Sequence, residues 1–196
     1  MALLEHFNLD LALIIQSYAG ESLDMPLELT CWYEGNKLPE TKMPNLKYLI
    51  WNGSSLKGIL NYKNIIHLDL KVSEGFAERD ISPLAELKLL ISLNLHRFNG
   101  DISPLAELKS LTHLDLYFFE GDISPLAGLI LLTNLDLHRF NGDISPLAEL
   151  ISLTSLDLSS FKGDISPLSR LPSLTSLDLR SFEGDKSILK HLKCSF

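Results

Sequence analysis

The sequence has few of the features that mark secreted, membrane-spanning or disulfide-bonded proteins. Only two cysteines occur among its 196 residues, Cys31 and Cys194, and they lie near opposite ends of the chain. A disulfide needs Cα atoms within about 7 Å, so an elongated fold would keep the two thiols apart, and unpaired cysteines suit a reducing compartment. No apolar run approaches the roughly 18 residues of a membrane span. These absences favour a cytoplasmic protein that has no membrane partner.

The chain also lacks an excess of basic residues. It carries 17 Lys and Arg against 25 Asp and Glu, for a net charge of −8, whereas a nucleic-acid surface needs a basic stripe. The opening MALLEHFNLDLALIIQSYAG contains no Lys or Arg and is interrupted by Glu5 and Asp10. Because a secretory leader begins with positive charge, this segment is not expected to be one.

Motifs that carry chemistry are missing as well. The sequence has no glycine-rich phosphate loop, no G-x-S-x-G elbow, and no C-x-x-C or H-E-x-x-H metal spacing. The protein is therefore predicted not to be an enzyme and to need no cofactor. With 45% hydrophobic and 21% charged residues, it still has the composition of a folded globular chain.

What the sequence does contain is a repeat with the pattern D-I-S-P-L-(A/S)-x-L-x-x-L-x-x-L-x-L-x-x-F-x-G. Its five copies lie 21 residues apart and begin at Asp80, Asp101, Asp122, Asp143 and Asp164. The L-x-x-L-x-L portion resembles the leucine-rich repeat, whose period is 20–29 residues, and the DISPL phrase resembles the internalin branch of that family. The resemblance implies an α/β solenoid: a right-handed coil with a parallel sheet on its concave face, short helical turns on its convex face and helical caps at both ends.

The repeat predicts a single domain over residues 1–196. Its leucines should point inward from short strands while alternate residues face out. Each Ser-Pro-Leu segment is expected to form a helical turn with Ser as N-cap and Pro at the first position. Strands are predicted near residues 27, 48, 67, 92, 113, 134, 155 and 176. The expected parts are an N-terminal helical cap (1–26), irregular repeats (27–79), five regular repeats (80–184) and a C-terminal cap (185–196).

One aromatic column departs from the family pattern. Three residues after the last strand leucine, where an asparagine is usual, the units place Phe98, Phe119, Phe140, Phe161 and Phe182, with Trp32 in the first unit. Phe neither donates nor accepts hydrogen bonds, so neighbouring coils or the Asp of Gly-Asp must satisfy the loop backbone. An exposed aromatic strip of this length would aggregate. The column is therefore predicted to be core.

A second column, between the two strand leucines, is acidic and faces outward. It comprises Glu28, Ile50, Asp69, Asn94, Asp115, Asp136, Asp157 and Asp178. Carboxylates on neighbouring strands lie about 4.8 Å apart and repel unless they are solvated or paired. The column lacks converging ligands, so a metal is not expected; a solvated acidic surface and a slot for a basic partner remain as alternatives.

The remaining outward positions vary most just past the strands. The units read His96-Arg97, Tyr117-Phe118, His138-Arg139, Ser159-Ser160 and Arg180-Ser181. An aromatic pair is thus flanked on both adjacent coils by His-Arg, and aromatics and Arg are enriched in interface hot spots. Drift between duplicated units is the alternative explanation. The candidate partner-binding residues are His96, Arg97, His113, Asp115, Tyr117, Phe118, Asp136, His138, Arg139 and Arg180.

A solenoid sheet that projects side chains at fixed spacing suits a protein partner. We therefore expect a non-catalytic protein-protein interaction scaffold that binds through its concave face. Weak self-association is also expected at the C-terminal end, where the cap is small. The alternative is a substrate adaptor of a ubiquitin ligase, because residues 7–18 resemble the opening helix of an F-box and F-box proteins often carry leucine-rich repeats.

Overall fold

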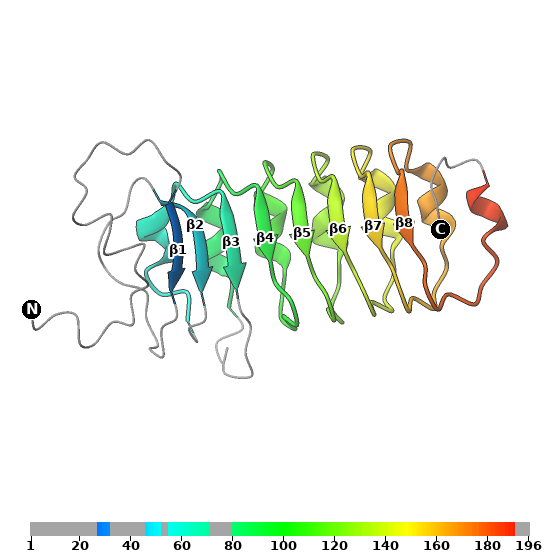
Figure 1. The fold of residues 1–196 in the computed structure, drawn as a ribbon, viewed down its shortest axis with the longest axis horizontal. Helices are drawn as coiled ribbons and strands as arrows, with labels where there is room; N and C mark the ends of the chain where they lie inside the picture. Colours follow the sequence, from blue (N-terminus) through cyan, green and yellow to red (C-terminus); the bar gives the residue numbers. More distant parts are fainter. Residues whose placement is uncertain (1–26, 32–45, 52–54, 71–79, 191–196) are drawn as a thin grey trace, which may run out of the picture.

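The computed structural model describes residues 27–31, 46–51, 55–70 and 80–190. Within them, parallel strands form one 8-stranded sheet in chain order, and short 3-10 turns stack behind it (Figure 1). The strands are β1 (Leu27–Cys31), β2 (Leu46–Trp51), β3 (His67–Leu70), β4 (Ser92–Asn94), β5 (His113–Asp115), β6 (Asn134–Asp136), β7 (Ser155–Asp157) and β8 (Ser176–Asp178). The turns are η1 (Ile59–Tyr62), η2 (Ser82–Glu86), η3 (Ser103–Glu107), η4 (Ser124–Gly128), η5 (Ser145–Glu149), η6 (Ser166–Arg170) and η7 (Ser187–Leu189).

The predicted fold class is confirmed, and each predicted strand begins where expected except β2, which begins two residues earlier, at Leu46. The constant repeat length keeps the strands in register, so that Leu93 pairs with Leu114 and Leu114 with Leu135. Each strand leucine therefore stacks on its equivalent in the next coil. The same register aligns the outward-facing side chains of successive coils in columns.

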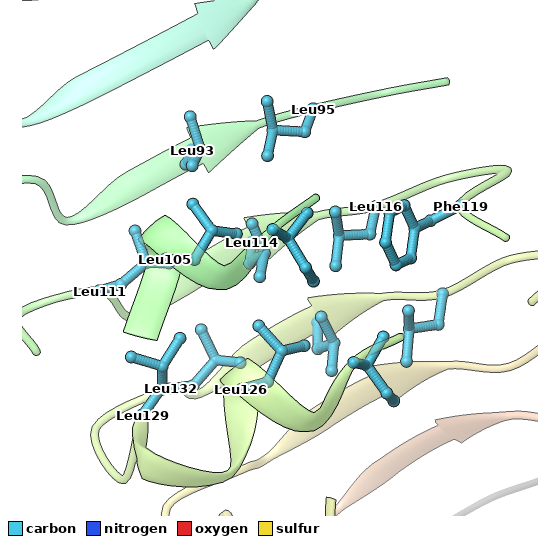
Figure 2. Close-up of a cluster of buried hydrophobic side chains, with 14 of the residues drawn as sticks. Leu93, Leu95, Leu105, Leu111, Leu114, Leu116, Phe119, Leu126, Leu129 and Leu132 are labelled. Carbon is cyan, nitrogen blue, oxygen red and sulfur yellow. The ribbon is translucent and has the colours of Figure 1, made fainter. Parts of the chain in front are cut away.

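The core is one continuous stack of aliphatic side chains between sheet and turns. Leu114 and Leu116 enter it from β5 and its end, Leu105 from η3 and Leu111 from the connecting segment (Figure 2); all four are at most 3% exposed. Burying one such leucine stabilises the fold by about 1.5–3 kcal/mol. A single coil cannot enclose its own leucines, so this stabilisation depends on stacking.

The predicted aromatic spine is confirmed in the first four regular coils. Phe98, Phe119, Phe140 and Phe161 are at most 1% exposed, and the Phe119 and Phe140 rings stack with centroids 6.5 Å apart. Phe182, in the last regular coil, is only partly buried; Trp32 lies outside the described residues. In the last four regular coils the ring covers the glycine two residues on, as at Gly142, where an added Cβ would lie 2.5 Å from Phe140 Cζ. The spine therefore explains the F-x-G phrase.

Backbone hydrogen bonds to the next coil satisfy the loops around the spine, as predicted. The Arg97 N–H donates to the Tyr117 carbonyl at 2.8 Å, and the Phe118 N–H donates to the His138 carbonyl at 3.1 Å. The spine residue bonds within its own turn: the Phe119 N–H donates to the Leu116 carbonyl. A non-polar spine is thus compatible with a satisfied loop backbone.

The predicted Ser N-cap is wrong. Each regular turn is a 3-10 helix that begins at the Ser itself, and the residue before it, Ile102 in η3, makes no side-chain capping bond. Asp101 Oδ1 instead accepts the Ser103 N–H at 2.8 Å and its hydroxyl at 2.6 Å. The aspartate of Gly-Asp therefore forms an Asx turn that leads into the 3-10 helix. These two bonds, the hydroxyl first, lower the pKa of Asp101.

The C-terminal cap, which is described as far as Lys190, has the same hydrogen bonds between an aspartate and the serine two residues further on. The Asp185 carboxylate accepts the Ser187 N–H at 2.7 Å, and Leu189 is fully buried against the last coil. The described part is thus a half-repeat closed by a 3-10 turn rather than by a longer helix. The N-terminal cap expected at 1–26 lies outside the described residues. No helix in the described ranges is long and apolar enough to cross a membrane.

Candidate functional site

The side chains of the acidic column accept hydrogen bonds from the backbone just past each regular strand. Its Oδ1 atoms accept the backbone N–H two residues further on at 2.8–2.9 Å; the pairs are Asn94 with His96, Asp115 with Tyr117, Asp136 with His138, Asp157 with Ser159 and Asp178 with Arg180. These bonds turn the backbone away from the strand direction. Asp115 and Asp136, predicted as partner contacts, therefore also position the side chains that follow them.

The next residue of each coil has a left-handed backbone. Its φ lies between 61° and 66° at Arg97, Phe118, Arg139, Ser160 and Ser181. This conformation costs a non-glycine residue about 1–2 kcal/mol. These positions hold neither Gly nor Asn, the residue types that favour positive φ, so the sequence gives no indication of this conformation.

Two ladders of side chains cross the coils that follow β4, β5 and β6. In the first, the Tyr117 ring lies between two imidazoles, with centroids 4.3 Å from His96 and 4.6 Å from His138. The His138 ring is parallel to Tyr117 within 3°, whereas the His96 ring is tilted by 36°. The exchange of His for Tyr in the middle copy thus produces a continuous stack.

The second ladder places Phe118 between two arginines. The Cζ atoms of Arg97 and Arg139 lie 5.6 and 4.7 Å from the Phe118 ring centroid, within the range of cation–π attraction. The Tyr117 and Phe118 rings meet edge to face at 4.5 Å, which joins the two ladders. We call the six residues the ring cluster: His96, Arg97, Tyr117, Phe118, His138 and Arg139.

Exposure differs within the ring cluster. The predicted outward aromatic pair, Tyr117 and Phe118, is half-buried because the flanking coils cover the ring faces. Arg97 and Arg139 are exposed. The guanidinium groups, more than the rings, therefore face a potential partner.

One contributor to the cluster was not singled out from the sequence. Ser159 is 2% exposed, donates its hydroxyl to Asp157 Oδ1 and is hydrogen-bonded to His138 Nδ1. A hydroxyl has one proton, so the donation to Asp157 assigns the proton of the second bond to His138 Nδ1. The chain Asp157–Ser159–His138 thereby fixes the imidazole that stacks on Tyr117. The small Ser in a column of His and Tyr is the sequence signal for this contact.

The other predicted contact residues lie apart from the ring cluster. His113 is exposed at the start of β5, where its Nδ1 lies 2.7 Å from Thr112 Oγ1. Arg180, two residues past β8, pairs with Asp178 at 2.7 Å. The described residues contain no group of His, Cys, Asp or Glu that could hold a metal ion.

Burial and two acidic neighbours act together on Asp136. The pKa of Asp136 is raised, chiefly because burial disfavours the ionised form and further because Asp115 and Asp157 are negative. Both neighbours pair with Asp136 in the sheet register. The bond from the His138 N–H opposes this shift.

An exposed apolar patch lies on another side of the coils, between the 3-10 turns and the strands. It consists of Ile130, Leu131 and Ile151, which are 52%, 51% and 55% exposed. One repeat earlier, the position of Ile130 holds Lys109. The patch was not singled out from the sequence, and it is a second surface against which the ring cluster can be compared.

No protein-family model and no curated protein sequence matches the chain, but solved structures share its fold. An internalin (inlF) of Listeria monocytogenes has a TM-score of 0.61 and 29% identity over 74% of this chain and 51% of that chain. An internalin C2 (inlC2) of the same species has a TM-score of 0.62 and 25% identity over 97% and 92%. A leucine-rich-repeat protein of Leptospira interrogans has a TM-score of 0.56 and 18% identity over 86% and 51%.

These likenesses differ in what they show. The similarity to the Leptospira protein concerns the fold alone. The two internalins share sequence as well as fold with the chain, which spans about half the length of the first.

Proposed function

We propose that this chain, a leucine-rich-repeat protein with internalin-like repeats of 21 residues, is a non-catalytic scaffold that binds another protein through its concave face, which comprises the sheet and the residues that directly follow its strands. Its fold neighbours support a protein-interaction repeat scaffold in general. The proposed contact surface is the ring cluster just past β4, β5 and β6.

The observation that carries the proposal is the double ladder itself. Three consecutive coils hold two aromatic rings, two imidazoles and two guanidinium groups in mutual contact. Side chains held in place before binding lose less conformational entropy in a complex. Tyr and Arg are also the types that dominate binding hot spots. The cluster thus combines suitable chemistry with preorganisation.

Affinity capture from the native cell tests this proposal. The bait is compared with the variant Tyr117→Ser/Phe118→Ser, which reproduces Ser159-Ser160 of a later coil and should therefore fold. We expect wild type to retain a protein that the variant loses. Identical sets of captured proteins from two baits with matching circular dichroism spectra would contradict the proposal and leave the ladders a purely structural role.

Other expectations from the sequence stay predictions. A cytoplasmic location rests on the cysteine pattern and composition, and self-association through the C-terminal end rests on the small cap. The segment that resembles an F-box helix, residues 7–18, lies outside the described residues, and no observation favours the ubiquitin-ligase adaptor over the scaffold.

A further inference from the structure

We infer that the partner presents an acidic peptide segment, whose carboxylates bind Arg97 and Arg139 on either side of Phe118. The inference rests on the proposed function and specifies the chemistry of the same site.

Neither guanidinium is neutralised by a carboxylate of the described residues. Among the described residues, no carboxylate lies within salt-bridge distance of Arg97 or Arg139, whereas Arg180 on the same surface is paired with Asp178 at 2.7 Å. Both side chains are exposed. Two free cations thus flank one ring on a chain whose net charge is −8.

Attraction to the Phe118 ring also positions the two cations. A guanidinium that packs on an aromatic face keeps its N–H edges free for in-plane, bidentate bonds to a carboxylate. The backbones of Arg97 and Arg139 are two strand spacings apart, about 9.6 Å, and both side chains lean toward Phe118. A single segment with two acidic side chains could reach both.

The surrounding charges favour the Arg97 end of the cluster. The acidic column holds the neutral Asn94 in that coil, whereas it holds Asp115 and Asp136 in the next two. The Oδ1 atoms of both aspartates are already bonded to backbone N–H groups. Negative repulsion of an incoming carboxylate is therefore weakest beside Arg97. Near the aspartates of the column, the same repulsion would weaken the binding of acidic segments that do not pair with the two arginines.

Fluorescence anisotropy with random copolymers tests the inference on the full chain. The probes are labelled poly(Glu,Tyr) and poly(Lys,Tyr) at low ionic strength, which limits screening. Wild type should bind poly(Glu,Tyr) more tightly. Arg97→Gln/Arg139→Gln should weaken that binding by about tenfold or more, as expected for lost charge-assisted hydrogen bonds. Arg170→Gln is the matched control and should leave the Kd unchanged, because Arg170 is an exposed arginine in η6, outside the candidate contact residues.

Three results would overturn the inference: no saturable binding of poly(Glu,Tyr) to wild type, equal Kd values for wild type and Arg97→Gln/Arg139→Gln, or tighter binding of poly(Lys,Tyr). Affinity capture separates this failure from that of the proposed function. A native partner lost by Tyr117→Ser/Phe118→Ser but kept by Arg97→Gln/Arg139→Gln would refute only the acidic segment. A partner kept by both variants would refute both proposals.

Discussion

The Tyr117 ring lies parallel to the His138 imidazole of the next coil, with centroids 4.6 Å apart and an interplanar angle of 3°. His96 covers the other side of the tyrosine at 4.3 Å. Two nearly identical copies of the repeat therefore enclose the one that differs from them. The difference forms part of a contact network, because each flanking copy supplies a side chain that packs on the exchanged one.

The stack predicts energetic coupling between Tyr117 and His138. In a double-mutant cycle of Tyr117→Ser and His138→Ser, we expect a coupling energy of about 0.5–1.5 kcal/mol, the range for aromatic pairs. Urea unfolding of the four proteins measures it. Tyr117→Ser combined with Arg180→Gln serves as the control and should be additive, since those residues are not in contact. Additivity of the first pair as well would mean that the stack contributes nothing.

The aromatic spine predicts a large effect at Phe119. Phe119→Asn should lower the free energy of unfolding by about 2–4 kcal/mol, because it removes a fully buried ring and leaves a cavity. Phe182→Asn, at the partly buried end of the spine, should cost less. Chemical denaturation measures the stability of both variants. An equal loss of unfolding free energy would show that the contribution of a spine residue does not depend on its burial.

The F-x-G phrase predicts a steric requirement for glycine beside the spine. In Gly142→Ala the new Cβ would lie 2.5 Å from Phe140 Cζ, so overpacking should destabilise the fold by about 1–3 kcal/mol. Gly128→Ala is the matched control. Its Cβ meets only the end of the flexible Lys109 side chain, at 2.7 Å, and should be tolerated.

A rescue experiment completes this prediction. Adding Phe140→Leu to Gly142→Ala should recover part of the stability that the alanine costs relative to Phe140→Leu alone. Thermal unfolding of both backgrounds gives the comparison. A penalty of the same size in each would assign the glycine requirement to something other than the ring.

The left-handed positions predict a stabilising substitution. Ser160 has φ 66°, and asparagine tolerates this conformation better than serine does. Ser160→Asn should raise the free energy of unfolding by about 0.5 kcal/mol, a fraction of the full left-handed penalty. Ser152→Asn, at a position without positive φ, should not. A gain at both positions, or at neither, would contradict the strain argument.

Two aspartates predict pH effects of opposite sign. The pKa of Asp136 is raised by burial and by its acidic neighbours, so its ionisation favours the unfolded chain as pH rises above the ordinary aspartate range. The pKa of Asp143 is lowered by the Ser145 hydroxyl and N–H, so its ionised form stabilises the fold, and this is lost as pH falls through the lowered pKa.

Asparagine at either position can retain the Oδ1 acceptor while removing the charge, as Asn94 does in the column. At neutral pH, Asp136→Asn should therefore raise the Tm and Asp143→Asn should lower it. Both differences should shrink in acid, when the wild-type carboxylates are protonated. Tm shifts of the same sign at neutral pH would show that the two carboxylates are not distinguished by their surroundings.

The stacked core could be predicted from the sequence because one period fixes it. Leu114 and Phe119 recur at the same offsets in every regular unit, and constant offsets in a parallel solenoid can only produce columns. The same constant offsets predict the positions of the strands. The Ser N-cap is predicted wrongly for a local reason. Asp101 precedes Ser103 by two residues, and its carboxylate accepts both the N–H and the hydroxyl of the serine.

The site was harder to predict because its contacts depend on backbone direction. Nothing in the residue types at Arg97 and Phe118 indicates a positive φ, yet this conformation accompanies their contact across coils. The bond between His138 and Ser159 also joins residues 21 positions apart. Adjacency of the ring-cluster residues could be inferred from the repeat, whereas their half-buried state could not.

The most direct test of the account is the affinity of the captured partner for two surface variants, measured by biolayer interferometry. Tyr117→Ser/Phe118→Ser alters the ring cluster, whereas Ile130→Lys/Ile151→Lys alters the apolar patch and follows the precedent of Lys109. We predict that the first variant weakens binding by at least about tenfold, as hot-spot removal does, and that the second leaves the Kd unchanged. Unchanged binding by the first variant and loss by the second would place the contact on the apolar patch and contradict the account.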